Sequence, residues 1–87
     1  MNNIKEELQF PLDWNYRIIA DESCQGALEG IKKVLAAHNA ATEPKVGKLS
    51  KNGSYRSYSV KVTFEDHESL RALSSALSAL PFVKFLL

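Results

Sequence analysis

The sequence predicts an α+β sandwich of βαββαβ order, in which an antiparallel sheet carries its helices on one face. Three observations lead to this prediction. Residues 14–21 and 54–65 alternate apolar and polar side chains, as half-buried strands do. The stretch that follows each of them repeats apolar side chains at helical spacing. Asn52-Gly53 separates the arms 45–51 and 54–65, which is the strongest short-range signal of a β-hairpin.

The length, composition and net charge of the chain indicate one small globular domain. The 87 residues are 45% apolar and 24% charged, with a net charge of +1. This composition allows a thin core and exerts no general attraction on nucleic acid or anionic lipid. Residues 1–13 are polar and contain Pro11, so we expect an N-terminal extension and then a single domain over residues 14–87. Glu6 and Glu7 stand where a signal peptide would be apolar, and no apolar run reaches the ~20 residues of a membrane span, which favours the cytoplasm.

The first strand and the first helix follow one another between residues 14 and 38. Ile19 is the one apolar residue on the otherwise polar face of the strand. The helix is expected from Ser23 to His38, with capping side chains just before it. The side chains expected on the buried faces are Trp14, Tyr16, Ile18 and Ala20 in the strand, and Cys24, Ala27, Leu28, Ile31, Val34, Leu35 and His38 in the helix.

The hairpin around Asn52-Gly53 has two open registers. A two-residue turn points Leu49 toward the core, whereas a three-residue turn with a bulge points Val46 inward beside Tyr58. We favour the second register because it gives the central Tyr58 an apolar neighbour. It also places Lys48 beside Arg56 near the rim of the sheet.

The second helix and the last strand complete the sandwich. Asp66 caps the helix, Pro81 ends it, and residues 82–87 form an apolar strand. Two βαβ units joined by a hairpin form the ferredoxin-like arrangement, with strand order 4-1-3-2 and both helices on one face. The residues expected to be most buried are Tyr58, Val60, Val62, Leu73 and Leu77.

The last strand is expected to lie at an edge of the sheet and to expose an apolar patch. Alternation points Val83, Phe85 and Leu87 toward the helices. The apolar side chains left together on the open face are then Ile19, Phe82 and Leu86. Because such patches commonly mark interfaces, we expect a monomer or weak homodimer whose patch is partly covered by Leu8 and Phe10.

The reactive residues do not indicate an enzyme or a metal centre. Cys24 is the single cysteine, and neither His38 nor His67 has an acidic residue or cysteine at ligand spacing. The loop at residues 20–25 is acidic and lacks the arginine with which acylphosphatases of this topology bind phosphate. We therefore expect no catalysis, no metal and no cofactor.

Gly26 and Gly30 lie on a stripe of small side chains along the first helix. A glycine inside a helix costs ~1 kcal/mol relative to alanine, so a close contact is expected to offset it. We favour contact with the alanine-rich shoulder of the second helix, at residues 72, 76 and 79. The alternative is that a partner's backbone or a small effector rests on the stripe.

An RNA-binding alternative depends on the basic hairpin, because RNA-recognition motifs share this topology. Base stacking needs aromatic side chains two positions apart on the open face. Tyr55 and Tyr58 are three positions apart and point to opposite faces, so we favour a solvated face over an RNA interface. The basic side chains of this alternative are Lys45, Lys48, Lys51, Arg56 and Lys61.

Short motifs along most of the chain resemble the YbeD-like family of small bacterial proteins. The resemblance implies a ferredoxin-like fold related to the ACT regulatory domains of amino-acid metabolism. It implies no established activity, although regulation of lipoate metabolism has been proposed for the family. The motifs are Phe10-Pro11, Trp14, Tyr16-Arg17, the turn at 50–55 with Ser57 and Ser59, and the terminal Val83-Lys84-Phe85-Leu86-Leu87.

The segment from Asp21 to Leu35 is also similar to the Asp-x-Pro-Gly-x-Leu-x-x-Ile stretch of ACT domains, with two additional residues and no proline. In ACT domains that glycine lets a small effector approach the helix N-terminus. The candidate ligand residues at this end of the chain are Asp21, Ser23, Gly26 and Gly30. We therefore expect a non-catalytic regulatory or interaction module of ACT-like architecture. Its partner would be an unidentified protein or a small effector, and an RNA-binding domain is the alternative.

Overall fold

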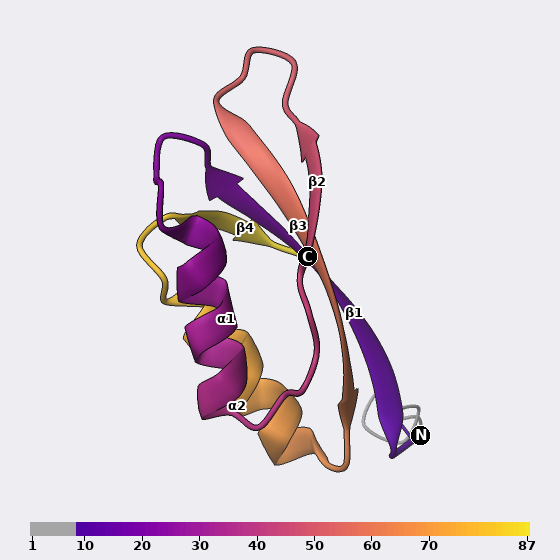
Figure 1. The fold of residues 1–87 in the computed structure, drawn as a ribbon. Helices are drawn as coiled ribbons and strands as arrows, with labels where there is room; N and C mark the ends of the chain where they lie inside the picture. Colours follow the sequence, from indigo (N-terminus) through magenta and orange to yellow (C-terminus); the bar gives the residue numbers. More distant parts are fainter. Residues whose placement is uncertain (1–8) are drawn as a thin grey trace.

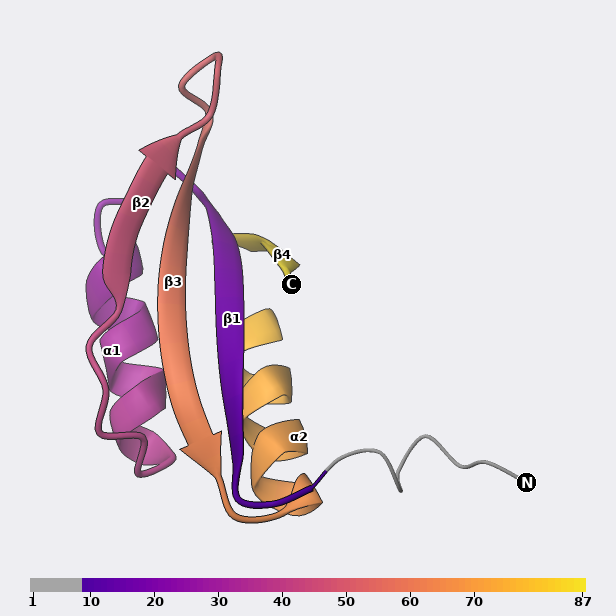
Figure 2. The same cartoon turned by 90° about the vertical axis from the view of Figure 1, so that its right-hand side faces the viewer.

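The computed structural model describes residues 9–87, in which two helices lie against one face of a four-stranded antiparallel sheet (Figure 1). The elements are β1 (Leu12–Asp21), α1 (Ala27–Ala37), β2 (Lys45–Leu49), β3 (Tyr55–Phe64), α2 (His67–Ser78) and β4 (Val83–Leu86). The strand order β2-β3-β1-β4 is the predicted order 4-1-3-2 counted from the other edge, so the prediction is confirmed. Viewed onto the sheet, both helices stand behind it, and among the described residues its other face is open (Figure 2).

The central pair β1 and β3 forms the longest ladder of the sheet. Its Cα partners run from Leu12 opposite Phe64 to Asp21 opposite Tyr55. The first strand therefore begins two residues earlier than expected, because Leu12 and Asp13 pair with the end of β3. This ladder positions the open-face side chains of β1 and β3 that are discussed below.

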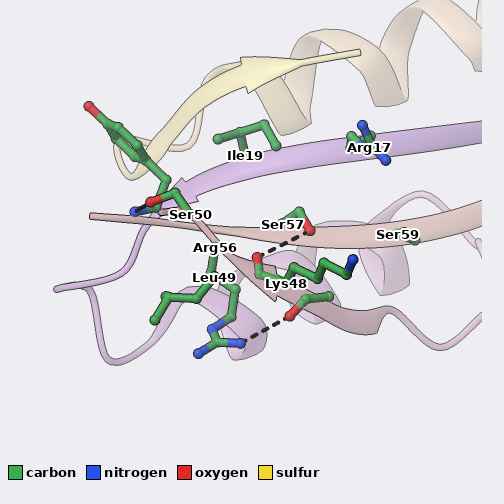
Figure 3. Close-up of a pocket in the computed structure, with 10 residues that line it drawn as sticks. Arg17, Ile19, Lys48, Leu49, Ser50, Arg56, Ser57 and Ser59 are labelled. Carbon is green, nitrogen blue, oxygen red and sulfur yellow. Dashed lines mark hydrogen bonds between the residues drawn. The ribbon is translucent and has the colours of Figure 1, made fainter. Parts of the chain in front are cut away.

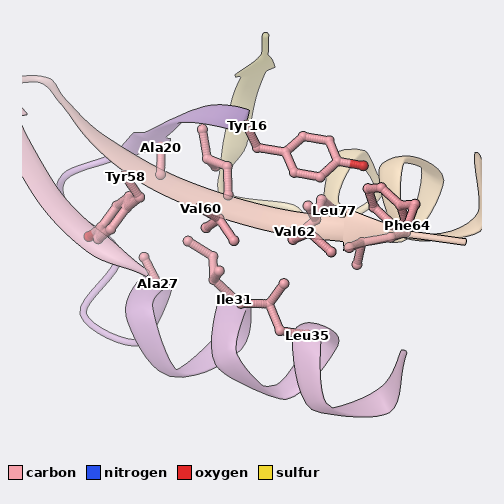
Figure 4. Close-up of a cluster of buried hydrophobic side chains, with 12 residues drawn as sticks. Tyr16, Ala20, Ala27, Ile31, Leu35, Tyr58, Val60, Val62, Phe64 and Leu77 are labelled. Carbon is pink, nitrogen blue, oxygen red and sulfur yellow. The ribbon is translucent and has the colours of Figure 1, made fainter. Parts of the chain in front are cut away.

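Alternate side chains of β1 and β3 meet one face of each helix to form the core (Figure 4). The predicted burial of Tyr58, Val60, Val62, Leu73 and Leu77 is confirmed, since each is at most 7% exposed. No charged side chain of residues 9–87 is buried. The rest of the buried hydrophobic core is Tyr16, Ile18, Ala20, Ala27, Ile31, Leu35 and Phe64.

The first helix begins at Ala27, later than the predicted start at Ser23. The carboxylate of Asp21 accepts hydrogen bonds from the backbone N–H and the hydroxyl of Ser23, at 2.9 and 2.7 Å. These bonds close a separate turn, so the expected helix cap at this position is wrong. Gly26 occupies the N-cap position without a side-chain cap. Cys24 consequently lies in the loop, half-buried against the core, rather than in the first helical turn.

The hairpin contains both predicted registers, separated by a bulge in β2. Val46 pairs with Tyr58, as predicted, whereas Leu49 pairs with Arg56 nearer the turn. The predicted pairing of Lys48 with Arg56 is wrong, because one extra residue in β2 shifts that strand between the two pairs. The hairpin tip projects beyond the helices (Figure 1), and the side chains of Val46 and Leu49 are both largely exposed.

A second bulge, in β4, reverses the predicted orientation of the last strand. Ile18 pairs with Leu86 and Ile19 with Phe85, and the next pair is displaced by one residue at Lys84. A shift of one residue turns side chains to the opposite face of a sheet. Leu86 therefore faces the helices and Phe85 faces the open side, so the predicted open-face position of Leu86 is wrong.

The second helix is capped and anchored as its sequence indicates. The carboxylate of Asp66 accepts a hydrogen bond from the backbone N–H of Ser69 at 2.8 Å, which lowers the pKa of Asp66. The hydroxyls of Tyr16 and Ser74 are 2.6 Å apart, and burial raises the pKa of the Tyr16 phenol. A hydrogen bond thus links β1 to α2 in addition to their apolar contacts.

We expect Tyr16→Phe to lower the free energy of unfolding by about 1 kcal/mol at neutral pH, because the hydrogen bond to Ser74 is lost. The folded-state pKa of Tyr16 is raised, so its titration does not affect stability below the unfolded-state pKa of about 10. As the pH rises from there through the folded-state pKa, stability is lost. Urea titrations at neutral and alkaline pH should show a steeper alkaline loss in the wild type than in Tyr16→Phe. Parallel pH profiles would contradict this.

Candidate functional site

The open face of the sheet carries a groove of about 480 Å³ where β1 and β3 meet the hairpin (Figure 3). Arg17 and Ile19 of β1 line it because their even-numbered neighbours turn toward the core. Ser57 and Ser59 of β3 form the adjoining wall, and Lys48 of β2 lies across from them. The groove is therefore lined by small hydroxyls and by cationic side chains.

The charge of this groove is positive, and no acidic residue lines it. Arg56 is already occupied, since its guanidinium donates to the Glu22 carboxylate at 2.9 Å and to the Gly47 carbonyl at 3.0 Å. The bond to Glu22 raises the pKa of Arg56. Arg17 and Lys48, in contrast, form no ion pair within residues 9–87. These two side chains are the available cations of the groove.

A second groove, of about 430 Å³, continues along the same face and is lined by cations and by one acidic residue, Glu43, whose carboxylate lies 3.8 Å from the Lys32 ammonium. It shares Arg17 and Ser59 with the first groove and adds Lys45 and Lys61. Lys61 lies 3.9 Å from the Asp13 carboxylate, and both side chains are mostly exposed. We call the four exposed cations of this face, Arg17, Lys45, Lys48 and Lys61, the basic strip.

An apolar strip borders the basic strip at the β1–β4 edge. Phe85 is 61% exposed and pairs with Ile19. Leu87 is 66% exposed and exchanges backbone hydrogen bonds with Arg17 at 2.9 and 3.0 Å. The apolar strip is thus Ile19, Phe85 and Leu87. Of the predicted patch, Ile19 alone lies on this face.

Phe82 belongs to the interior side of the sheet and packs against α1. A Cβ built on Gly30 would lie 2.9 Å from the Phe82 ring. The close contact that explains a glycine inside α1 is therefore this ring. The predicted contact with the alanine shoulder of α2 is wrong at Gly30, and the ring occupies the space that the alternative assigned to a partner or effector.

A double-mutant cycle tests the Gly30–Phe82 contact. In a Phe82→Ala background, Gly30→Ala should stabilise the chain by about 1 kcal/mol, because alanine is favoured in a helix and the ring is absent. In the wild type the same substitution should stabilise less or destabilise, because the ring has to move. Urea unfolding of the four proteins measures the difference. If Gly30→Ala changes the free energy of unfolding equally in both backgrounds, the Gly30–Phe82 contact contributes nothing to stability.

The predicted effector residues do not form one site. Asp21 and Ser23 border a shallow depression together with Tyr55 and Lys84, and the Asp21 carboxylate is already bonded within its own turn. The bonds from Ser23 lower the pKa of Asp21. Gly26 is the N-cap of α1 and has open space beside it, whereas the Phe82 ring fills the space beside Gly30.

The basic residues that the RNA-binding alternative requires do not form one continuous group of free cations within residues 9–87. Arg56 is bonded to Glu22, and Lys61 lies near Asp13. Tyr55 borders the open-face groove while Tyr58 is buried, which confirms that they point to opposite faces. The remaining three residues, Lys45, Lys48 and Lys51, are exposed along the hairpin.

The prediction that Phe10 partly covers the apolar patch is wrong. Its ring packs on His67 with centroids 5.3 Å apart, at the start of α2 and away from β4. Leu8, the other predicted cover, lies outside the described residues. Within residues 9–87, no cluster of His, Cys, Asp or Glu side chains could hold a metal ion, and neither helix is long and apolar enough to cross a membrane.

Sequence reasoning missed the residues that give the open face its character. Arg17 could have been found, because it alternates onto the same face as Ile19 and the serines of β3. Phe85 and Leu87 could not be placed, because their orientation depends on the bulge at Lys84. No local pattern in the terminal strand marks that bulge.

Comparison with known proteins places the chain in a family. Residues 5–87 match the family described as "Protein of unknown function (DUF493)". The chain belongs to this family. A UPF0250 protein of Shewanella sediminis (strain HAW-EB3) is 28% identical over 79 residues, which cover 91% of this chain and 89% of that protein. The predicted membership of the YbeD-like family of small bacterial proteins is thereby confirmed.

Solved structures place the DUF493 chain among ACT-like folds. Protein HP0495 from Helicobacter pylori matches with a TM-score of 0.76 and 21% identity, over 92% of this chain and 85% of that one. The ACT domain from GTP pyrophosphokinase of Chlorobium tepidum matches with a TM-score of 0.63 and 14% identity, over 87% and 95% of the two chains. At such identities the likeness shows the fold alone, and the predicted ACT-like architecture is confirmed.

Proposed function

We propose that this chain is a non-catalytic regulatory or interaction module whose open sheet face contacts a partner protein. The observation that carries the proposal is the apolar strip, because two of its three side chains are more than half exposed on a face that the helices leave open. Exposed apolar groups beside unpaired cations are typical of interfaces. The ACT domain of the pyrophosphokinase, which shares the fold, is itself part of an enzyme. The YbeD-like resemblance suggests a metabolic enzyme as the partner, with lipoate metabolism as its setting.

Comparative affinity capture tests the proposal. Wild-type chain, Phe85→Ser and the matched control Lys33→Ser are immobilised and exposed to extract of the native cell. Lys33 is exposed on α1 and away from the open face. We expect a protein that the wild type and Lys33→Ser retain, that Phe85→Ser loses, and that binds again when purified. Retention that is identical for all three chains, or retention of nucleic acid alone, would contradict the proposal.

We also propose weak self-association through the β4 edge. The outer edge of β4 pairs with no other strand of residues 9–87, and such edges recruit further strands. Lys84 limits the association, because a second copy would bring a like charge to the same edge. Sedimentation velocity should show a concentration-dependent dimer that Phe85→Ser reduces and Lys33→Ser leaves unchanged. A strictly monomeric wild type at high concentration would refute this arrangement.

A further inference from the structure

The two strips of the open face adjoin along one strand. Arg17 of the basic strip and Ile19 of the apolar strip are successive outward residues of β1. Leu87 sits opposite Arg17, held by two backbone hydrogen bonds. An occupant that covers this face therefore meets cations on its β2–β3 side and apolar carbon on its β4 side.

From this arrangement we infer that the open face binds an acidic amphipathic segment of a partner protein. Carboxylates of the segment lie along the basic strip, and its apolar side chains lie on the apolar strip. The inference rests on the proposed function and specifies the chemistry of the partner. A wholly polar anion would leave the apolar strip exposed, and a wholly apolar segment would desolvate Arg17 without compensation.

The dimensions of the face suit such a segment. Neighbouring strands are about 4.8 Å apart, so the three gaps from β2 to β4 span about 14 Å, which accommodates the 10–12 Å diameter of a helix with its side chains. Arg17 stands near the middle of that span and can form paired hydrogen bonds with a carboxylate. Ser59, exposed and adjacent to Arg17 across the β1–β3 ladder, adds a hydroxyl donor.

Charge complementarity decides between an acidic segment and the other occupants. The first groove is lined by three cationic residues and no acidic one, and only Arg56 among the three is neutralised in an ion pair of the described chain. A cationic segment would be repelled by Arg17 and Lys48. RNA would find phosphate contacts there but no aromatic pair at stacking distance along one strand, since Tyr58 is buried.

The test uses the full chain and a synthetic helical peptide. The peptide has about four helical turns, with glutamates on one face and leucines on the other. Titration is followed by amide chemical shifts of the ¹⁵N-labelled chain. A second peptide carries lysine in place of each glutamate, and an oligouridine serves as a nucleic-acid probe. The protein variants are Arg17→Glu and the matched charge reversal Lys33→Glu on α1.

We expect the acidic peptide to shift the amide signals of Arg17, Ser59 and Phe85, with affinity falling as salt rises. Arg17→Glu should weaken binding about tenfold or more, whereas Lys33→Glu should leave it unchanged. The lysine peptide should not bind. Shifts confined to other surfaces, equal binding of both peptides, equal effects of the two charge reversals, or tighter binding of oligouridine would overturn the inference. If the peptide fails while affinity capture still finds a Phe85-dependent partner, the proposed function stands and the acidic chemistry is wrong.

Discussion

Replacing Leu77 with alanine is expected to lower the free energy of unfolding by about 2–5 kcal/mol. The side chain is completely buried between α2 and the sheet, so truncation leaves a cavity that rigid β-strands cannot close. Small domains have total stabilities of only ~5–15 kcal/mol, and the loss therefore removes a large share of the free energy of unfolding.

Chemical denaturation followed by circular dichroism measures this loss. Arg71→Ala is the matched control, because Arg71 is exposed on the same helix and its truncation removes no core contact. The control should stay within about half a kcal/mol of the wild type. A comparably small loss for Leu77→Ala would mean that α2 does not pack against β1 and β3 as described.

Valine in place of Gly47 is expected to destabilise the chain by about 1–3 kcal/mol, although valine is normally favoured in strands. A Cβ at this position would overlap the Ser57 hydroxyl and approach the Ser57 carbonyl oxygen to 3.0 Å. The backbone of β2 must then move away from β3. This movement also strains the hydrogen bond from Arg56 to the Gly47 carbonyl.

Lys45→Val is the control for strand propensity, because Lys45 lies in the same edge strand and is exposed. Equilibrium unfolding should give a free energy of unfolding that is well below the wild-type value for Gly47→Val and close to it for Lys45→Val. Adding Ser57→Ala to Gly47→Val should restore part of the loss, since the hydroxyl is removed and the carbonyl remains. If Gly47→Val is as stable as Lys45→Val, the close approach of β2 to β3 is wrong.

Much of the fold could be predicted because its determinants are local. The outward and inward residues of β1 follow from strict alternation around Tyr16 and Ile18. The position of α2 follows from a leucine repeat between Asp66, which caps the helix, and Pro81. Once two such βαβ units are joined by a hairpin, few compact arrangements remain, and so the strand order was predictable.

The errors in the orientation of strand side chains share one physical cause, which is that bulges shift a strand by a single residue. The bulge at Lys84 turned Phe85 and Leu87 outward and Leu86 inward. The bulge in β2 let Val46 and Leu49 follow different registers within one short strand. A bulge exchanges local ladder bonds for better packing elsewhere, so its position depends on contacts that are distant in sequence.

By itself the sequence determined the order of the elements, the core of β3 and α2, and the presence of a basic hairpin, because periodicity and turn chemistry act over a few residues. Tertiary structure alone decided which side chains of β4 join the open face. The Phe82 ring entered the space beside Gly30, and Arg17 came to lie against Leu87. These placements depend on the close packing of segments far apart in the chain, where one residue of register sets which face of the sheet a side chain occupies.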